Sequence, residues 1–201
     1  MKKLLLAGVA LGVALAIAPV AQATTYTIDF TSMPLYTPVS SGPDVTISIS
    51  GGQYGSGTPV TGSFRNPALG NSPTGDYPTS EDLNFAFSSP ASNISFYYDN
   101  YGAVAGPCSG RGCSYANAYN ASSALVSSTY IGDISPGGFG GLVTVPGTGI
   151  SLLQVDNGSG GGSSWEFGVY SISYTVPEPT SLALLGVGLA GYGLIARRRR
   201  G

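Results

Sequence analysis

Apolar and polar residues alternate along most of the middle of this 201-residue chain, and no stretch there has a long helical period. Within 44–50, for example, Val45, Ile47 and Ile49 share one face, while threonine and serine occupy the other. Such alternation indicates half-buried β-strands. It predicts strands at 25–30, 44–50, 83–88, 93–100, 123–131, 141–145, 151–156 and 164–175.

Glycine, proline, serine and asparagine separate these stretches, which favours an all-β fold. We expect an antiparallel β-sandwich, jelly-roll-like; a single sheet or a solenoid is the alternative, although no fixed repeat is present. The residues 89–92 predict a turn at a hairpin or a sandwich corner. The stretches 51–80 and 102–123 are predicted to be long loops, and the first is expected to contain one strand near 60–64. In the last strand the apolar parity changes, which suggests either a bulge at Gly168 or a strand that is covered on both sides.

The first 23 residues have the pattern of a secretory signal peptide. Lys2 and Lys3 precede an apolar run, and Ala21 and Ala23 form the small-x-small site that a signal peptidase accepts, so cleavage is expected before Thr24. An uncleaved anchor helix is the alternative.

Residues 24–176 then form one extracytoplasmic domain, and this body is strongly acidic. Its only basic residues are Arg65 and Arg111, whereas the whole chain has a net charge of −2. A body of this charge repels phosphate backbones, which argues against nucleic acid as a partner.

The tail, 177–201, has three parts in order. Pro177, Glu178 and Pro179 come first, an uncharged apolar run occupies 180–196, and Arg197, Arg198, Arg199 and Arg200 follow. As a helix the run reaches roughly 25 Å at about 1.5 Å per residue, which barely crosses a bilayer core of about 30 Å. The arginines should stay in the cytoplasm, so the Pro-Glu-Pro triplet is displayed outside.

This tail resembles the PEP-CTERM sorting signal of Gram-negative bacteria. The resemblance implies export across the inner membrane, a transient anchor there, and processing by an exosortase, with Pro177, Glu178 and Pro179 as recognition residues. It also implies a final place at the cell surface or in the extracellular matrix, often with exopolysaccharide and biofilm. The body loosely resembles the β-sandwich domains that many such proteins carry.

The two cysteines, Cys108 and Cys113, lie in the sequence PCSGRGC. In an exported chain a disulfide between them is expected. The alternative is half of a metal site, but the chain has no histidine and no further cysteine to complete a zinc site.

The chemistry that the composition allows is narrow. Without histidine, and with no lysine in the body, triads, Cys-His pairs and Ser-Lys dyads are excluded, so we predict a protein that is not an enzyme. A hydrolase with a carboxylate pair remains a weaker alternative.

Two binding chemistries fit the residues at strand ends and in loops. We expect no cofactor unless calcium binds, which would use oxygen ligands from Glu81, Asp82, Asp99 and Asp156. Sugar binding would use aromatic faces, with Tyr97, Tyr101 and Trp165 as candidates and Tyr115 and Tyr119 as further ones. The sequence therefore predicts an exported protein with a structural or adhesive role, and a carbohydrate-binding module, with or without calcium, is the alternative.

Overall fold

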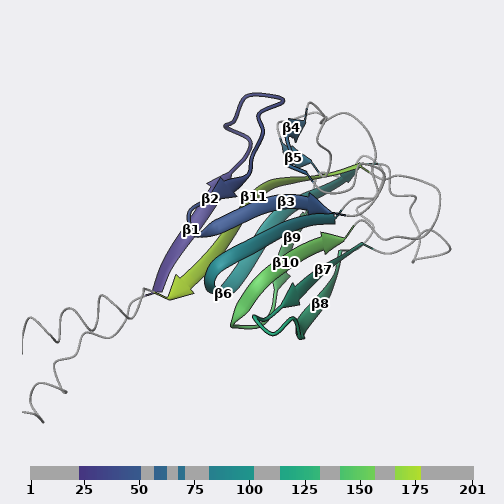
Figure 1. Cartoon of the computed structure of the whole chain (residues 1–201). Helices are drawn as coiled ribbons and strands as arrows, with labels where there is room; N and C mark the ends of the chain where they lie inside the picture. The colour runs from purple at the N-terminus through teal and green to yellow at the C-terminus, as the bar shows by residue number, and fades with distance from the viewer. Residues whose placement is uncertain are drawn as a thin grey trace, which may run out of the picture. The chain divides into compact units, whose positions relative to one another are not determined.

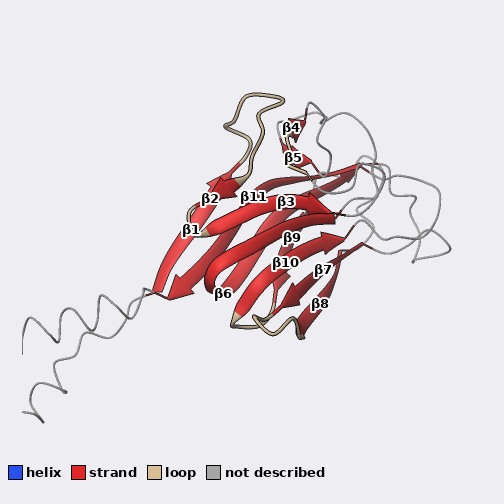
Figure 2. Cartoon of the chain, in the orientation of Figure 1, coloured by secondary structure: helices blue, strands red, loops and turns tan. Residues whose placement is uncertain are grey.

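The computed structural model describes residues 23–50, 57–62, 68–70, 82–101, 114–131, 141–156 and 166–177 (Figure 1). Thr25–Val176 form one compact unit. Every regular element in the described ranges is a β-strand (Figure 2). The strands are β1 (Ala23–Asp29), β2 (Ser41–Gly42), β3 (Val45–Ser50), β4 (Thr61–Gly62), β5 (Ala68–Gly70), β6 (Asp82–Tyr101), β7 (Ser114–Tyr119), β8 (Leu125–Ile131), β9 (Gly141–Val145), β10 (Ile150–Asp156) and β11 (Glu166–Pro177).

The strands form two layers of a β-sandwich, which confirms the predicted fold class. In the first, here called the β11 layer, β11 pairs with β1, β5 and the second half of β6, and β6 pairs with β9. In the second, the β10 layer, the order is β2, β3, the first half of β6, β10, β7 and β8. The pairings with printed registers are all antiparallel, and the strand β6 belongs to both layers.

The crossing of β6 between the layers decides between the two alternatives predicted at 89–92: the sandwich corner is right and the hairpin turn is wrong. No hairpin turn interrupts 89–92, because β6 continues through them as a single strand of 20 residues. The buried positions nevertheless change parity, from Leu83, Phe85 and Phe87 to Ile94 and Phe96. Asn93, with a φ of 51°, lies at this change. A left-handed residue inside a strand re-aims the side chains that follow it, so the corner is made within the strand.

A β-bulge in β11 accounts for the parity change that the sequence shows there. Val169 pairs with Tyr98 and Ser171 pairs with Tyr97, so Tyr170 is the extra residue. Gly168 pairs regularly with Asp99, which places the bulge two residues beyond the predicted position. Because of the bulge, Val169 and Ile172 are both fully buried.

The β10 layer corrects a second prediction. The stretch 102–123 is not entirely loop, because β7 lies in it and pairs with both β8 and β10. Its small alternating residues, Ala116 and Ala118, are fully buried. Alanine and asparagine are weak strand formers, and this explains why the sequence alone suggested a loop. The short strand β4 lies within the region where one hidden strand was expected.

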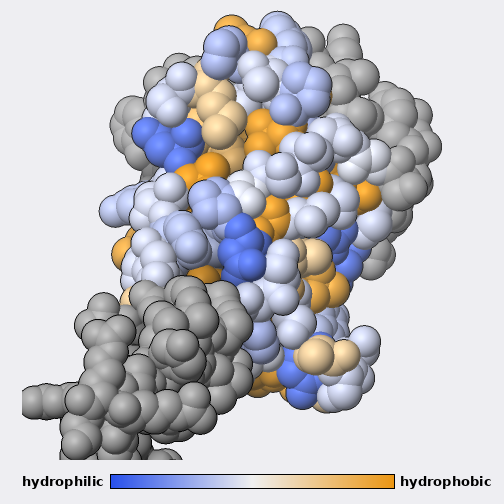
Figure 3. Space-filling view, turned by 60° about the vertical axis from the view of Figure 1, so that its left-hand side comes forward, coloured by the Kyte–Doolittle hydropathy of each residue, from blue (hydrophilic) through white to orange (hydrophobic). Residues whose placement is uncertain are grey.

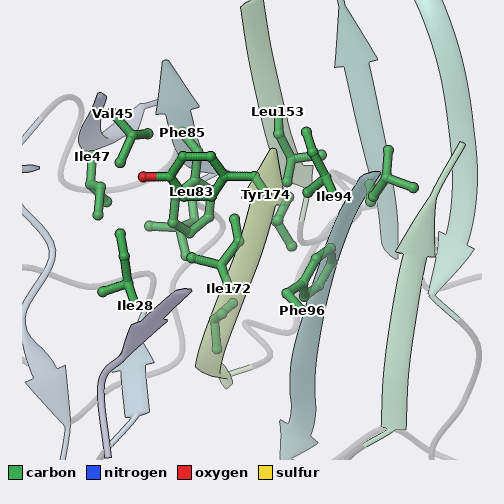
Figure 4. Close-up of a cluster of buried hydrophobic side chains, with 14 of the residues drawn as sticks. Ile28, Val45, Ile47, Leu83, Phe85, Ile94, Phe96, Leu153, Ile172 and Tyr174 are labelled. Carbon is green, nitrogen blue, oxygen red and sulfur yellow. The ribbon is translucent and has the colours of Figure 1, made fainter. Parts of the chain in front are cut away.

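The core lies between the two layers and draws on both (Figure 4). Phe87 of the β10 layer meets Tyr174 of the β11 layer, with ring centroids 5.0 Å apart. The Tyr174 hydroxyl donates a hydrogen bond to the Pro43 carbonyl, across the two layers. Burial, the nearby Asp44 carboxylate and Tyr26 raise the pKa of Tyr174 to about 12. This tyrosine therefore joins the layers as a neutral phenol.

The two ends of the body lie on neighbouring strands. Thr25 and Thr175 share a hydroxyl hydrogen bond of 3.0 Å between β1 and β11. Ala23, the last residue of the expected signal peptide, is the first residue of β1, and Pro177 is the last residue of β11. The rest of the signal peptide and the tail from Glu178 lie outside the described residues. The part of the chain that the structure describes contains no helix capable of spanning a bilayer.

Candidate functional site

A shallow open groove of about 420 Å³ runs over the outer face of the β11 layer. Its lining comes from three neighbouring strands and the turn after β1: Thr27, Asp29, Thr31, Tyr97, Tyr170 and Ser171. The volume falls within the range of about 300–1,000 Å³ that small-ligand sites occupy. The groove is therefore large enough for a ligand, and it is open enough for an extended one.

The bulge in β11 gives the groove its second aromatic residue. In a regular strand, successive side chains point to opposite faces. Because Tyr170 is the extra residue, it and its neighbour Ser171 both line the outer groove. The Tyr170 carbonyl accepts a hydrogen bond of 2.9 Å from the Phe30 amide. This bond ties the bulge to the end of β1.

The carboxylate of Asp29 is fixed by the turn that ends β1. Its Oδ1 accepts hydrogen bonds from the Thr31 amide, at 2.9 Å, and from the Thr31 hydroxyl, at 2.6 Å. The Ser32 hydroxyl donates to the Asp29 carbonyl at 3.0 Å. Local bonds of this kind are the ordinary way in which aspartate fixes a turn. They hold one carboxylate oxygen and leave Oδ2 as an acceptor at the exposed end of β1.

Tyr97 supplies the exposed ring of the groove. Half of its surface is accessible, and it pairs directly with Ser171 on one side and Leu142 on the other. The next residues along the same face are small and hydroxylated: Thr27 donates to Ser173 at 3.2 Å, and Ser173 pairs with Ser95. The Tyr97 ring thus lies beside a row of short hydroxyl side chains, with Leu142 on its other side.

The face of the molecule that Figure 3 draws is mostly polar. Figure 3 shows hydrophobic residues in small separate patches among polar ones. No lysine or arginine occurs within the described ranges, whereas aspartates do. A groove with tyrosine rings, hydroxyls and a carboxylate, and with no cation among the described residues that line it, suits a ligand that is uncharged and rich in hydroxyl groups.

The structure brings only one of the predicted sugar-binding residues into the groove. Tyr97 lies there, while the side chain of Tyr101 and all of Trp165 lie outside the described residues. Sequence reasoning missed Asp29 and Tyr170. The change of apolar parity in the last strand is the sequence signal for Tyr170, although the sequence alone places the bulge at Gly168.

The predicted calcium ligands are only partly described. Asp82 accepts a hydrogen bond of 3.0 Å from the Gln154 side chain. Asp99 and Asp156 lie in β6 and β10, but their side chains, and all of Glu81, fall outside the described part. Among the side chains that are described, no three metal-ligating groups cluster. Calcium binding stays a prediction, as do the disulfide between Cys108 and Cys113 and the retention role of Arg197–Arg200.

Comparison with known families bears on the tail. The model of the PEP-CTERM protein-sorting motif matches residues 175–200. This match confirms the resemblance carried by Pro177, Glu178 and Pro179. The motif begins inside β11, because residues 175–177 are the last residues of that strand. It implies export, processing by an exosortase and a transient membrane anchor.

Comparison with known structures bears on the fold of the body. The chain is similar to two mutants of a family 29 carbohydrate-binding module, CBM29-2, whose structures were solved to probe ligand recognition. The sequence identities are 12% and 11%, and the TM-score is 0.42 for each. The match covers 77% of this chain and 92% and 93% of those chains. This likeness concerns the fold alone. No curated protein matches the chain significantly.

Proposed function

We propose that this chain is an exported surface or matrix protein whose sandwich binds an uncharged polysaccharide through the groove on the β11 layer. The PEP-CTERM motif accounts for its delivery, and the groove accounts for its attachment to the polymer. The role is structural or adhesive and links the protein to exopolysaccharide, as in a biofilm.

The observation that carries this proposal is the convergence of Tyr97, Tyr170 and Asp29 on one groove. Sugar rings have apolar faces that pack on aromatic rings, and hydroxyl edges that need donors and acceptors. Tyr97 offers a half-exposed ring, and Asp29 and the threonines offer oxygen acceptors and hydroxyl donors. The open shape supports binding along a polymer rather than enclosure of one small molecule.

The charge of the described surface supports an uncharged ligand. The charged side chains within the described ranges are carboxylates, and no lysine or arginine occurs there. An anionic polymer would bring like charges together, and the described residues of the groove lining include no cation to offset them. We therefore expect neutral glycans to bind and alginate-like polyanions not to bind.

The proposal assigns no reaction to the groove. Among the described residues that line it, Asp29 is the only carboxylate, and glycoside hydrolysis ordinarily needs two carboxyl groups on either side of the scissile bond. The groove as described has the chemistry of recognition.

Replacing Tyr97 tests the proposal. We expect Tyr97→Ala to weaken binding of the full chain to uncharged polysaccharide about tenfold or more, since a stacked ring and its burial are lost. Binding is measured by isothermal titration calorimetry, with the chain in a detergent that has no sugar headgroup. Tyr36→Ala is the matched control, because Tyr36 is 49% exposed against 50% for Tyr97 but does not line the groove. Equal affinities of the two variants for the polysaccharide would contradict binding at the groove.

The sorting part of the proposal has its own test. Glu178→Ala should leave the protein unprocessed and retained in the membrane, because the motif is what the exosortase recognises. Thr180→Ala, just outside the triplet, is the control and should be processed normally. The mass of the protein recovered from host cells reports the result, and unchanged processing of the Glu178 variant would contradict recognition through this motif.

A further inference from the structure

The outer face of the β10 layer carries a continuous line of polar side chains across five strands. Ser48 of β3 pairs with Asn84 of β6, and Asn84 pairs with Gln154 of β10. Gln154 in turn pairs with Asn117 of β7, and Asn117 with Ser128 of β8. We call these five residues the amide row. It extends roughly 19 Å, since neighbouring strands lie about 4.8 Å apart.

Part of the amide row is fixed by its own hydrogen bonds. The Asn84 side-chain amide donates to Ser50 at 2.7 Å, and the Gln154 side-chain amide donates to Asp82 at 3.0 Å and to Asn84 at 3.4 Å. The Ser128 hydroxyl donates to Asn117 Oδ1 at 2.7 Å. These bonds set the direction in which each amide points, because an amide that donates on one side presents its oxygen on the other.

Two groups in the middle of the row have hydrogen-bonding capacity to spare. Within the described part of the chain, neither Asn117 Nδ2 nor Gln154 Oε1 has a hydrogen-bond partner. They belong to directly paired residues, and both side chains are partly exposed. A donor and an acceptor side by side are the complement of a sugar hydroxyl, which both accepts and donates.

Tyrosines flank this donor and acceptor. Tyr115 and Tyr119 lie two residues to either side of Asn117, on the same face of β7. Tyr115 pairs with Tyr130 of β8, and the two rings meet edge to face with centroids 5.7 Å apart. Tyr130 is 43% exposed. Aromatic rings thus lie next to the amide row on β7 and β8, close to Asn117 Nδ2 and Gln154 Oε1, which have no hydrogen-bond partner in the described part of the chain.

We propose that the outer face of the β10 layer is a second binding surface for uncharged, extended polysaccharide, centred on Asn117, Gln154 and Tyr130. The two layers pack through the core, so their outer faces point away from each other. One copy of the chain then holds two polymer strands, one on each face, and cross-links them. The cross-linking rests on the proposed function of the groove, whereas binding by the amide row stands independently of it.

The number of binding sites per chain is the direct test. The full chain, in a detergent without a sugar headgroup, is titrated calorimetrically with uncharged hexasaccharides of glucose, mannose or galactose, each separately. The expected result is two sites per chain. A variant that combines Asn117→Ala with Tyr130→Ala should keep one site and lose the other, with affinity there weakened about tenfold or more.

Controls separate this proposal from loss of the fold and from failure of the groove. The remaining groove site, together with an unchanged melting profile, shows that the double variant is folded. Thr46→Ala changes an exposed residue on the same layer outside the amide row and should retain both sites. If the Asn117/Tyr130 variant keeps the wild-type number of sites, the second surface is refuted. If Tyr97→Ala instead leaves every site intact, the groove is refuted while the amide row stands.

Discussion

The two outer faces of the sandwich carry polar side chains on paired strands, but they are built in different ways. The β11 layer uses short hydroxyl residues such as Thr25, Thr27 and Ser173, and its groove depends on the bulge at Tyr170. The β10 layer uses longer amides in regular register, with Asn84 and Gln154 tied to each other. Small hydroxyls leave room for a groove, whereas amides fill the surface and align donors and acceptors. The difference shows how one fold can offer two surfaces.

The largest effect should come from the strand that the two faces share. Phe96 is almost fully buried in the second half of β6, and β6 pairs in both layers. Phe96→Ala should lower the free energy of unfolding by about 3–5 kcal/mol through the lost burial and the remaining cavity. Denaturant unfolding measures this value. Because β6 joins the layers, both faces should lose ligand binding together at the same denaturant concentration; loss of one face alone would contradict a shared strand.

Removal of the bulge should separate the two faces. With Tyr170 deleted, Val169 and Ser171 become neighbours and can keep their pairing with Tyr98 and Tyr97. The strand alternation then becomes regular, so we expect the fold to survive with about 1 kcal/mol lost with the hydrogen bond to Phe30. Binding at the groove should fall about tenfold or more, since a lining ring is gone. Calorimetry should still detect the β10 face. Undiminished groove binding would mean that the bulge has no part in the site.

The hydrogen bond between Tyr174 and Pro43, which joins the two layers, should make stability depend on pH and should affect both faces equally. Tyr174 has a pKa of about 12 in the folded protein, against about 10 for an unperturbed tyrosine, so folding favours its neutral form. Its contribution is fully present below pH 10 and is lost as pH rises from about 10 towards 12. Tyr174→Phe should cost about 1 kcal/mol near pH 7 through the lost hydrogen bond to Pro43. Melting temperatures should fall less steeply above pH 10 in this variant; parallel curves for both proteins would argue against the shifted pKa.

The smallest effect should come from the hydroxyl pairs of the β11 layer. Thr25→Val removes the exposed hydrogen bond to Thr175 but keeps a β-branched shape suited to a strand. The free energy of unfolding should change by no more than about 0.5 kcal/mol. Thermal melts give the value. A loss of several kcal/mol would show that these hydroxyls hold β1 in place rather than furnish an open surface.

The sequence predicted the sandwich because alternation is a direct record of which face of a strand is buried. Val45, Ile47 and Ile49 alternate in the sequence and are buried in the structure. β7 escaped prediction because its buried residues, Ala116 and Ala118, are too small to produce a strong apolar pattern. The continuous β6 escaped because Pro90 is a turn signal in most contexts, and here it lies within a strand.

The groove could be predicted only in part. Tyr97 lies on a polar face, and this was visible in the sequence. The position of Asp29 depends on which strand pairs with β11, and no local pattern encodes that pairing. Likewise, the amide row requires the register of five strands at once, and a one-residue slip of any one strand would turn its member of the row to the core. Long-range register is therefore what separates the predictable fold from the unpredicted surfaces.

Site-resolved chemical modification tests the central claim most directly. Exposed tyrosines of the full chain are nitrated with and without a saturating uncharged hexasaccharide, and each tyrosine is followed by peptide mass spectrometry. We expect nitration of Tyr97 to fall strongly in the presence of the glycan, and nitration of Tyr36, which is equally exposed, to stay unchanged. Equal nitration of Tyr97 with and without bound glycan would contradict binding at the groove.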